Sequence, residues 1–281
     1  MDFKLNRKIS RIILAILAVL AVLSWTAVFA SQDNKLHIHF YDIGQGDGIY
    51  IRTPAGQDII IDGGPDATIL GKLGQDMPFY DREIELMIPT HPDADHITGL
   101  VDILERYEVK MVLWNGAEKG TAVFKKMKKL IQEKNVPTKI AIVGQEITAG
   151  NVKFYILHSE KEDKDMNNTS IVAKLIYGKD TTLFTGDAGK PVEYDLIKQG
   201  FNLKSDILKV GHHGSKTCTS QEFLEAVDPE YAIISVGAHN SYGHPTKEVL
   251  DRLKGRKIFR TDLDGDVECI LDGREISCQG S

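Results

Sequence analysis

The stretch that decides the fold is Thr90-His91-Pro92-Asp93-Ala94-Asp95-His96. It holds two imidazoles and two carboxylates in a short span, and it follows a mostly apolar run, residues 84–88, that is typical of a β-strand. Pro89 ends that run, and Pro92 disfavours both a resumed strand and a regular helix start. The four side chains are therefore expected on an irregular loop at the carboxyl end of a strand. Nitrogen and oxygen donors so spaced suit divalent metals such as zinc or manganese.

Outward from this loop, short apolar strands alternate with amphipathic helices. Runs of strands come in two blocks, each followed by helices, which favours two sheets packed face to face with helices outside. No Pro- or Gly-rich linker interrupts residues 36–281, so we expect one domain there. Strands are predicted over 36–43, 48–53, 58–61, 83–88, 110–114, 139–143, 152–157, 171–177, 182–185, 206–210 and 231–236, and helices over 97–107, 121–134, 192–199, 220–227 and 247–253.

Residues 1–30 differ in kind from the rest. A basic beginning precedes an apolar run over 12–30, which is typical of a signal peptide or of a single membrane anchor. Small residues at Val28 and Ala30 suit cleavage after Ala30, but the sequence does not separate the two alternatives. In either case we expect the domain outside the cytoplasm of a bacterium, secreted or membrane-anchored, and no obligate protein partner is inferred.

The charge of the chain gives no general attraction to nucleic acid. The net charge is −6, and it becomes about −9 without residues 1–30, which carry +3. A local basic face would have to come from one predicted helix, although a solvated helix face is the favoured interpretation of its five lysines: Lys125, Lys126, Lys128, Lys129 and Lys134.

The three cysteines give one candidate disulfide. Cys269 and Cys278 flank a turn predicted at Asp272-Gly273. They are not opposite each other in a two-residue hairpin, so a disulfide would need a shifted register, and an exported domain would permit one. Cys218 is left free, and nothing marks it as a nucleophile.

Polar residues follow other predicted strands as well. Asp62-Gly63-Gly64 ends the third strand, Thr185-Gly186-Asp187 ends another, and Gly211-His212-His213-Gly214-Ser215 ends a third, while Asn167-Asn168-Thr169-Ser170 precedes a strand. Glycines around paired histidines let the backbone approach a ligand closely. Carboxylates and imidazoles gathered at one sheet edge would need a cation to relieve their repulsion and desolvation.

These motifs resemble the metallo-β-lactamase superfamily, whose loop has the form His-x-His-x-Asp-His, with Asp93 here in place of the second histidine. More narrowly, residues 42–47, 208–215 and 240–245 resemble the hydrolase domain of ComEC-type competence proteins. The resemblance covers 36–281 and implies an α/β fold, a four-layer αββα sandwich. Without the many membrane spans of full-length members, the sequence resembles a stand-alone version of that domain behind one export segment, and DNA translocation is not implied.

The resemblance further implies a binuclear site for two zinc or manganese ions. His91 and Asp93 would bind the first ion, Asp95 and His96 the second, and Asp187 both. Either His212 or His213 would complete the second position, and Asn167 or Asn168 stands where the family has a third histidine. The oxygen-rich set shifts the preference toward manganese.

Supporting roles are also implied around the metals. Asp95 would take part in catalysis. His244 would contact the substrate phosphate or protonate the leaving oxygen, or it is only a turn histidine held by Pro245. Ser215 is a candidate substrate contact, and Asp47 and Asp62 would support the ligand loop. His37, His39 and His158 receive no function.

The leading functional hypothesis is an exported, metal-dependent phosphodiesterase or nuclease acting on DNA. A second hypothesis keeps the metals but takes an envelope phosphodiester, such as a phosphorylcholine-decorated teichoic acid. A β-lactamase is disfavoured by Asp93 and the missing third histidine. A third hypothesis is a non-catalytic binding module that has lost its metal.

Overall fold

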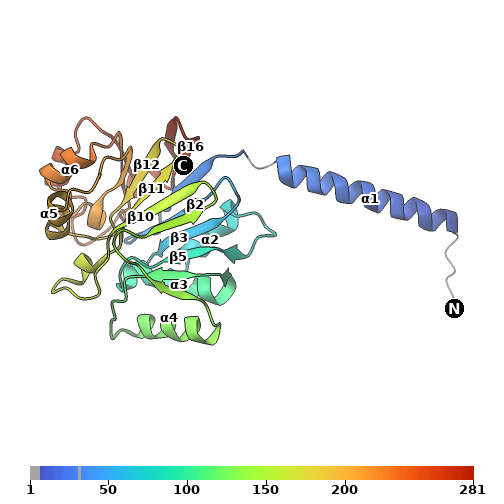
Figure 1. Cartoon of the computed structure of the whole chain (residues 1–281), viewed down its shortest axis with the longest axis horizontal. Coiled ribbons are helices and arrows are strands. Elements are labelled where there is room, and N and C mark those ends of the chain that lie inside the picture. Colours follow the sequence, from blue (N-terminus) through green and yellow to red (C-terminus); the bar gives the residue numbers. More distant parts are fainter. Residues whose placement is uncertain (1–6, 31–32) are drawn as a thin grey trace.

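The structure is a computed structural model that describes residues 7–30 and 33–281, with only the backbone over 23–30. Helix α1 (Arg7–Ala30) lies apart from the sheets (Figure 1). Among the described residues, no helix has both the length and the apolar character needed to cross a bilayer. The side chains at the predicted cleavage position, Val28 and Ala30, lie outside the described part, as does Lys4 of the basic beginning.

Two large sheets form the centre of the domain, and a short third sheet pairs β4 (Glu83–Ile84) with β6 (Glu108–Val109). The first sheet runs, in spatial order, β17 (Ile276–Gly280), β16 (Val267–Leu271), β1 (Leu36–Phe40), β2 (Gly48–Arg52), β3 (Asp58–Gly63), β5 (Leu86–Ile88), β7 (Val112–Trp114) and β8 (Thr138–Ile140). The second runs β15 (Lys257–Arg260), β14 (Tyr231–Ile234), β13 (Ile207–Lys209), β12 (Asp180–Phe184), β11 (Val172–Tyr177), β10 (Val152–His158) and β9 (Glu146–Ala149).

Helices cover the outer face of each sheet (Figure 1). The first sheet carries α2 (Thr68–Asp76), α3 (Ala94–Arg106) and α4 (Ala122–Glu133). The second carries α5 (Lys190–Lys198), α6 (Gln221–Val227) and α7 (Lys247–Arg252). Short helical segments complete the chain: η1 (Met166–Thr169), η2 (Gly211–Gly214) and α8 (Thr261–Asp264).

Three apolar clusters separate the four layers. Strand β3 shows why: Ile59 and Ile61 point into the cluster between the two sheets, while Ile60 points into the cluster beneath α2, α3 and α4. A third cluster lies between the second sheet and its helices. A strand buried on both faces reads as a continuous apolar run. The αββα sandwich expected from the sequence is confirmed.

Parallel strands position the polar loops. β3, β5, β7 and β8 are parallel to one another, and so are β12, β13, β14 and β15. The loops that follow their carboxyl ends meet at one edge of the sandwich.

The loop after β5 differs from the prediction. Helix α3 begins at Ala94, with Asp93 at its N-cap in extended conformation, so Asp95 and His96 lie on the first helical turn. The prediction of an irregular loop through His96 was wrong, because Pro92 lies before the cap, where a fixed φ does not oppose a helix. The helix also begins earlier than the predicted residue 97.

The C-terminal hairpin corrects a second expectation. Cys269 lies directly opposite Cys278, and the two form a disulfide. The turn contains four residues, 272–275, because Leu271 pairs with Ile276. The sequence suggested a two-residue turn, which would have placed the cysteines out of register. Cys218 is free and buried.

A candidate metal centre at the sheet edge

The metal centre is assembled from loops that follow strands of both sheets. β5 leads to His91, and α3 places Asp95 and His96 beside it. Asp187 follows β12, and His213 follows β13 within η2. Positions distant in the sequence meet because each loop leaves the same end of its strand.

Three buried imidazoles form the heart of the centre. The Nε2 atoms of His91, His96 and His213 are all inaccessible to water and have no hydrogen-bond partner, and neither has Oδ1 of Asp187. The other oxygen of Asp187 lies 3.3 Å from Nε2 of His96 and 3.6 Å from Nε2 of His213. Unpartnered buried donors are rare in native proteins, so this group has the chemistry of a cation site.

The opposite nitrogen of each ring is held in place. Partners at Nδ1 are Thr90 Oγ1 for His91 (3.0 Å), Asp62 Oδ2 for His96 (2.8 Å) and the Ser235 carbonyl for His213 (2.9 Å). A neutral imidazole whose Nδ1 is engaged in this way presents Nε2 as a lone-pair donor. All three rings are therefore oriented as metal ligands.

Two overlapping ligand groups share His96. His91, His96 and Asp187 offer ligand atoms within 4.8 Å of one another, and so do Asp95, His96 and His213. Asp95 Oδ2 is 4.0 Å from His96 Nε2 and 3.9 Å from His213 Nε2. The arrangement provides neighbouring positions for two ions.

The paired histidines occupy unequal positions. His213 is buried and belongs to a ligand group, whereas the His212 side chain is 26% exposed, with Nε2 3.7 Å from Asp187 Oδ2. Both residues have a positive φ, 46° and 55°, which is uncommon for residues other than glycine. Gly214 also has φ +81°, and a Cβ there would lie 2.5 Å from the Pro245 Cβ. This tight, strained turn aims both rings at Asp187.

Asp93 and Asn167 lie at the rim of the centre. Asp93 Oδ1 pairs with Lys119 Nζ at 2.7 Å, and Asp93 belongs to neither ligand group. Asp93 nevertheless lines a small cavity that opens at the metal centre. Asn167 also lines that cavity. Asn168 instead binds Asp163 and the backbone N–H of Gly189. Of the two asparagines left open by the sequence, Asn167 is therefore the one that faces the centre.

Two buried carboxylates hold the surrounding loops. Asp62 accepts hydrogen bonds from the backbone N–H and the hydroxyl of Thr90, in addition to contacting His96. Asp47 pairs with the fully buried Lys209 at 2.8 Å, and its other oxygen lies 3.5 Å from His213 Nδ1. No motif in the sequence marks Lys209 or Lys119 as a partner of an acid.

Burial and charge set the protonation states. Burial lowers the pKa of His91 to about 3. Burial would lower the pKa of His96 too, but Asp187 and Asp62 outweigh it and raise that pKa well above its usual value. Burial opposes ionisation of Asp187, yet His213 and His96 hold the pKa of its carboxyl well below the usual range. Positive charge is thus favoured beside Asp187, as protons or as metal ions.

A hollow of about 210 Å³ leads to the centre. His244 and Tyr242 line it, with their rings stacked at 5.7 Å, and Gln45 lies at its edge. Burial, with His212 and His213 nearby, lowers the pKa of His244, so its ring is neutral at neutral pH. Nothing in the sequence singles out Tyr242 beyond its place in the 240–245 motif.

Other candidates point elsewhere. The Ser215 hydroxyl contacts Thr217 Oγ1 at 2.9 Å, and Ser215 does not line the hollow. On α4, lysines are paired with acids: Lys126 with Glu105, Lys128 with Glu118 and Lys129 with Glu133. These pairs fit the solvated helix face that the sequence favoured. His158 contacts the Asn168 carbonyl.

Comparison with known proteins bears on these features. A family model described as the metallo-β-lactamase superfamily matches residues 41–239. The chain is 30% identical over 264 residues to ComE operon protein 3 of Bacillus subtilis, covering 86% of this chain and 34% of that protein. It is 32% identical over 244 residues to competence protein ComA of Neisseria gonorrhoeae, covering 85% of this chain and 33% of that protein. The chain thus spans about a third of the length of the curated relatives it matches.

A solved structure shows the same fold. The metallo-β-lactamase fold protein YhfI of Bacillus subtilis superposes with a TM-score of 0.58 at 13% identity, covering 80% of this chain and 96% of that one. At this identity the likeness concerns the fold alone. The resemblance drawn from the sequence motifs, to this superfamily and to its competence-protein members, is confirmed.

Proposed function

Because the chain belongs to the metallo-β-lactamase superfamily, we propose that it is a binuclear metal-dependent hydrolase that cleaves phosphodiesters, with DNA as its substrate. The observation that carries the proposal is the set of three buried, unpartnered imidazole nitrogens around Asp187. The choice of DNA rests on the relative named a competence protein and on the shared motifs.

The residues present fit two divalent ions, zinc or manganese. His91 and Asp187 would hold one, with Asp93 and Asn167 at its rim. Asp95, His96 and His213 would hold the other, sharing Asp187. When bound, such ions activate water and stabilise charge in an in-line displacement at phosphorus.

His244 then has a defined part to play. Its ring lines the hollow, lies 5.7 Å from the His212 ring and is neutral because its pKa is lowered. A neutral imidazole donates one N–H, which suits a hydrogen bond to a non-bridging phosphate oxygen better than proton delivery to a leaving group. The hollow is small, so it accommodates one phosphate group of an extended DNA strand.

We place the domain outside the cytoplasm, secreted or held at the membrane by the N-terminal segment. The Cys269–Cys278 disulfide supports this placement, because disulfides persist in oxidising compartments.

The test is hydrolysis of bis-p-nitrophenyl phosphate by metal-replete protein, followed by a panel of single-stranded DNA, duplex DNA and choline-bearing wall polymer. Cleavage of DNA is expected. Cleavage of the wall polymer alone would show that the substrate is the envelope phosphodiester. The net negative charge of the chain is compatible with that substrate too. Fewer than one metal per chain after manganese and zinc loading, with no turnover, would make the protein a binding module.

A further inference from the structure

A second cluster of imidazoles and carboxylates lies on the helix-bearing face of the first sheet. His37 and His39 share one face of β1 because side chains alternate along a strand, and the register places His39 opposite Glu268 of β16. Ligand atoms of these three side chains lie within 4.8 Å of one another. None of the three lines the hollow at the catalytic centre.

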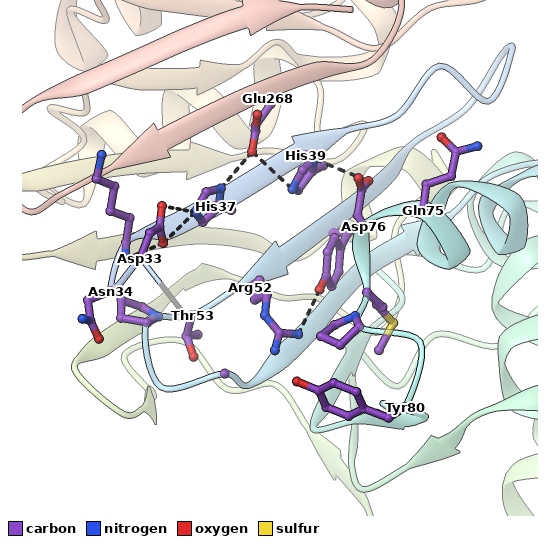
Figure 2. Close-up of a pocket in the computed structure, with 16 residues that line it drawn as sticks. Asp33, Asn34, His37, His39, Arg52, Thr53, Gln75, Asp76, Tyr80 and Glu268 are labelled. Atoms are coloured by element: carbon purple, nitrogen blue, oxygen red, sulfur yellow. Dashed lines mark hydrogen bonds and ion pairs between the residues drawn. The ribbon is translucent and has the colours of Figure 1, made fainter. Parts of the chain in front are cut away.

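Each imidazole in this cluster stands between two carboxylates (Figure 2). His37 Nδ1 is 2.8 Å from Glu268 Oε1, and its Nε2 is 3.0 Å from Asp33 Oδ2. His39 Nε2 is 3.7 Å from the same Glu268 oxygen, and its Nδ1 is 3.5 Å from Asp76 Oδ2. Glu268 is therefore shared, while Asp33 and Asp76 each lie behind one ring.

The hydrogen-bond balance of the cluster favours a cation. A neutral imidazole has one N–H and can satisfy one of the two carboxylates that face it. Three carboxylates surround two imidazoles. Of the cations that line the same groove, Arg52 is paired with Asp58 at 2.8 Å, and Lys35 lies beside Asp33 in the sequence. Burial, moreover, lowers the pKa of His39.

The cluster also opens into a groove that is larger than the hollow at the metal centre. A groove of about 550 Å³ is lined by His37, His39 and Glu268, together with Tyr80 and with Arg52, which pairs with His37 in the β1–β2 register (Figure 2). His37, His39 and Glu268 are 20%, 14% and 26% exposed, so an ion can enter from solvent.

We propose that this groove holds a second, mononuclear metal site that binds Zn²⁺ through His37 Nδ1, His39 Nε2 and the Glu268 carboxylate. Two imidazoles with one carboxylate form a donor set that zinc accepts, and a fourth position faces the groove for water. Asp33 and Asp76 orient the rings from behind, as carboxylates do behind zinc-bound histidines. Asp76 is itself held by the Tyr41 hydroxyl at 2.8 Å.

The bound ion would tie distant parts of the chain together. It would link β1 to β16 of the C-terminal hairpin, and through the carboxylates it would engage Asp76 at the end of α2 and Asp33 just before β1. Zinc binding at this site therefore stabilises the fold, in addition to any stabilisation by metal bound at the catalytic centre.

The experiment measures Zn²⁺ binding to the full chain by calorimetric titration, in a His96→Ala/Asp187→Ala background that removes two of the ligands proposed for the catalytic centre. One equivalent is expected to bind there and to raise Tm. Adding Glu268→Gln or His39→Ala should weaken binding by at least ~100-fold and abolish the rise in Tm, and Asp76→Asn should weaken it by about 10- to 100-fold. His239→Ala, which removes an exposed histidine that lines neither hollow, is the matched control and should change nothing.

Two results would overturn the proposal. One is a background protein that melts cooperatively yet binds no Zn²⁺, which would leave the cluster as hydrogen-bonded ion pairs. The other is a His37→Ala/His39→Ala variant that keeps its parent's stoichiometry and affinity. Should the background variant not fold, the same comparison is made in the otherwise unchanged chain, where Glu268→Gln must lower the zinc content by one equivalent while phosphodiester hydrolysis is retained.

Discussion

The two imidazole clusters of this domain contrast in how they are built. At the sheet edge, His96, Asp187 and His213 are at most 3% exposed, and their ligand atoms have no hydrogen-bond partners. In the groove, His37 and Glu268 are partly exposed, and their ligand atoms contact each other. The first cluster depends on loops from both sheets, and the second on alternation along β1 and the register with β16. Both clusters contain imidazoles and carboxylates, so residue type does not distinguish their need for a cation. Buried ligand atoms depend on a cation more strongly, because water can solvate ligand atoms only where it can reach them.

The largest expected effect separates the two clusters by activity. Asp187→Ala removes a carboxylate that belongs to one ligand group and lies 3.6 Å from His213 Nε2 of the other. It should lower kcat/KM for bis-p-nitrophenyl phosphate by at least ~10³-fold, comparable to loss of a major electrostatic contribution to the transition state. His96→Ala should do the same, and both variants should retain a native circular dichroism spectrum. Glu268→Gln is the control in the groove. Unchanged turnover in Asp187→Ala would refute the catalytic centre.

A metal-removal experiment sharpens the same contrast. Dialysis against a chelator should abolish hydrolysis, and restoring manganese or zinc should recover it in both the unchanged chain and Glu268→Gln. Zinc content after reloading should be lower in Glu268→Gln by one equivalent. Activity that survives complete metal removal would contradict the proposed chemistry.

The support behind the rings provides a matched pair. Asp62 holds His96 in the centre, as Asp76 faces His39 in the groove. Asp62→Asn should lower metal affinity at the catalytic centre by about 10- to 100-fold and lower activity at limiting metal, with recovery at excess metal. Asp76→Asn should leave activity unchanged. A loss of activity in Asp62→Asn that excess metal does not rescue would mean that Asp62 acts only in folding.

The next change probes the substrate side of the centre. His244→Ala should reduce kcat/KM by about 10- to 100-fold, the cost of one hydrogen bond to a charged oxygen, with metal content unaffected. His239→Ala is the control on the same loop, between β14 and α7. A fall in bound metal in His244→Ala would assign His244 to the ligands instead.

The smallest effect concerns the hairpin that carries Glu268. Cys269→Ser/Cys278→Ser should lower the free energy of unfolding by about 2–3 kcal/mol, as expected for a short closed loop, without loss of hydrolysis. Chemical denaturation of the oxidised protein and the variant measures this. Equal stability would show that the strand pairing of β16 with β1 is sufficient to hold the hairpin.

The sequence by itself determined the fold and the kinds of side chain at its edge. Strands buried on both faces leave continuous apolar runs, as residues 59–61 do, and polar residues directly after such runs mark the strand ends. The resemblance of the motifs to the metallo-β-lactamase superfamily placed His91, His96 and Asp187 in one site, although β5 and β12 belong to different sheets. The apolar runs and the polar residues that follow them are local features, so they can be recognised in one sequence.

Only the tertiary structure decided which partner each side chain takes. His213 rather than His212 is buried with the ligands, because a left-handed turn of η2 brings its Nδ1 to the Ser235 carbonyl after β14. Lys119 forms an ion pair with Asp93. A four-residue turn brings Cys269 opposite Cys278. Each of these outcomes depends on segments that meet through packing, and spacing along one chain contains no information about distances across layers.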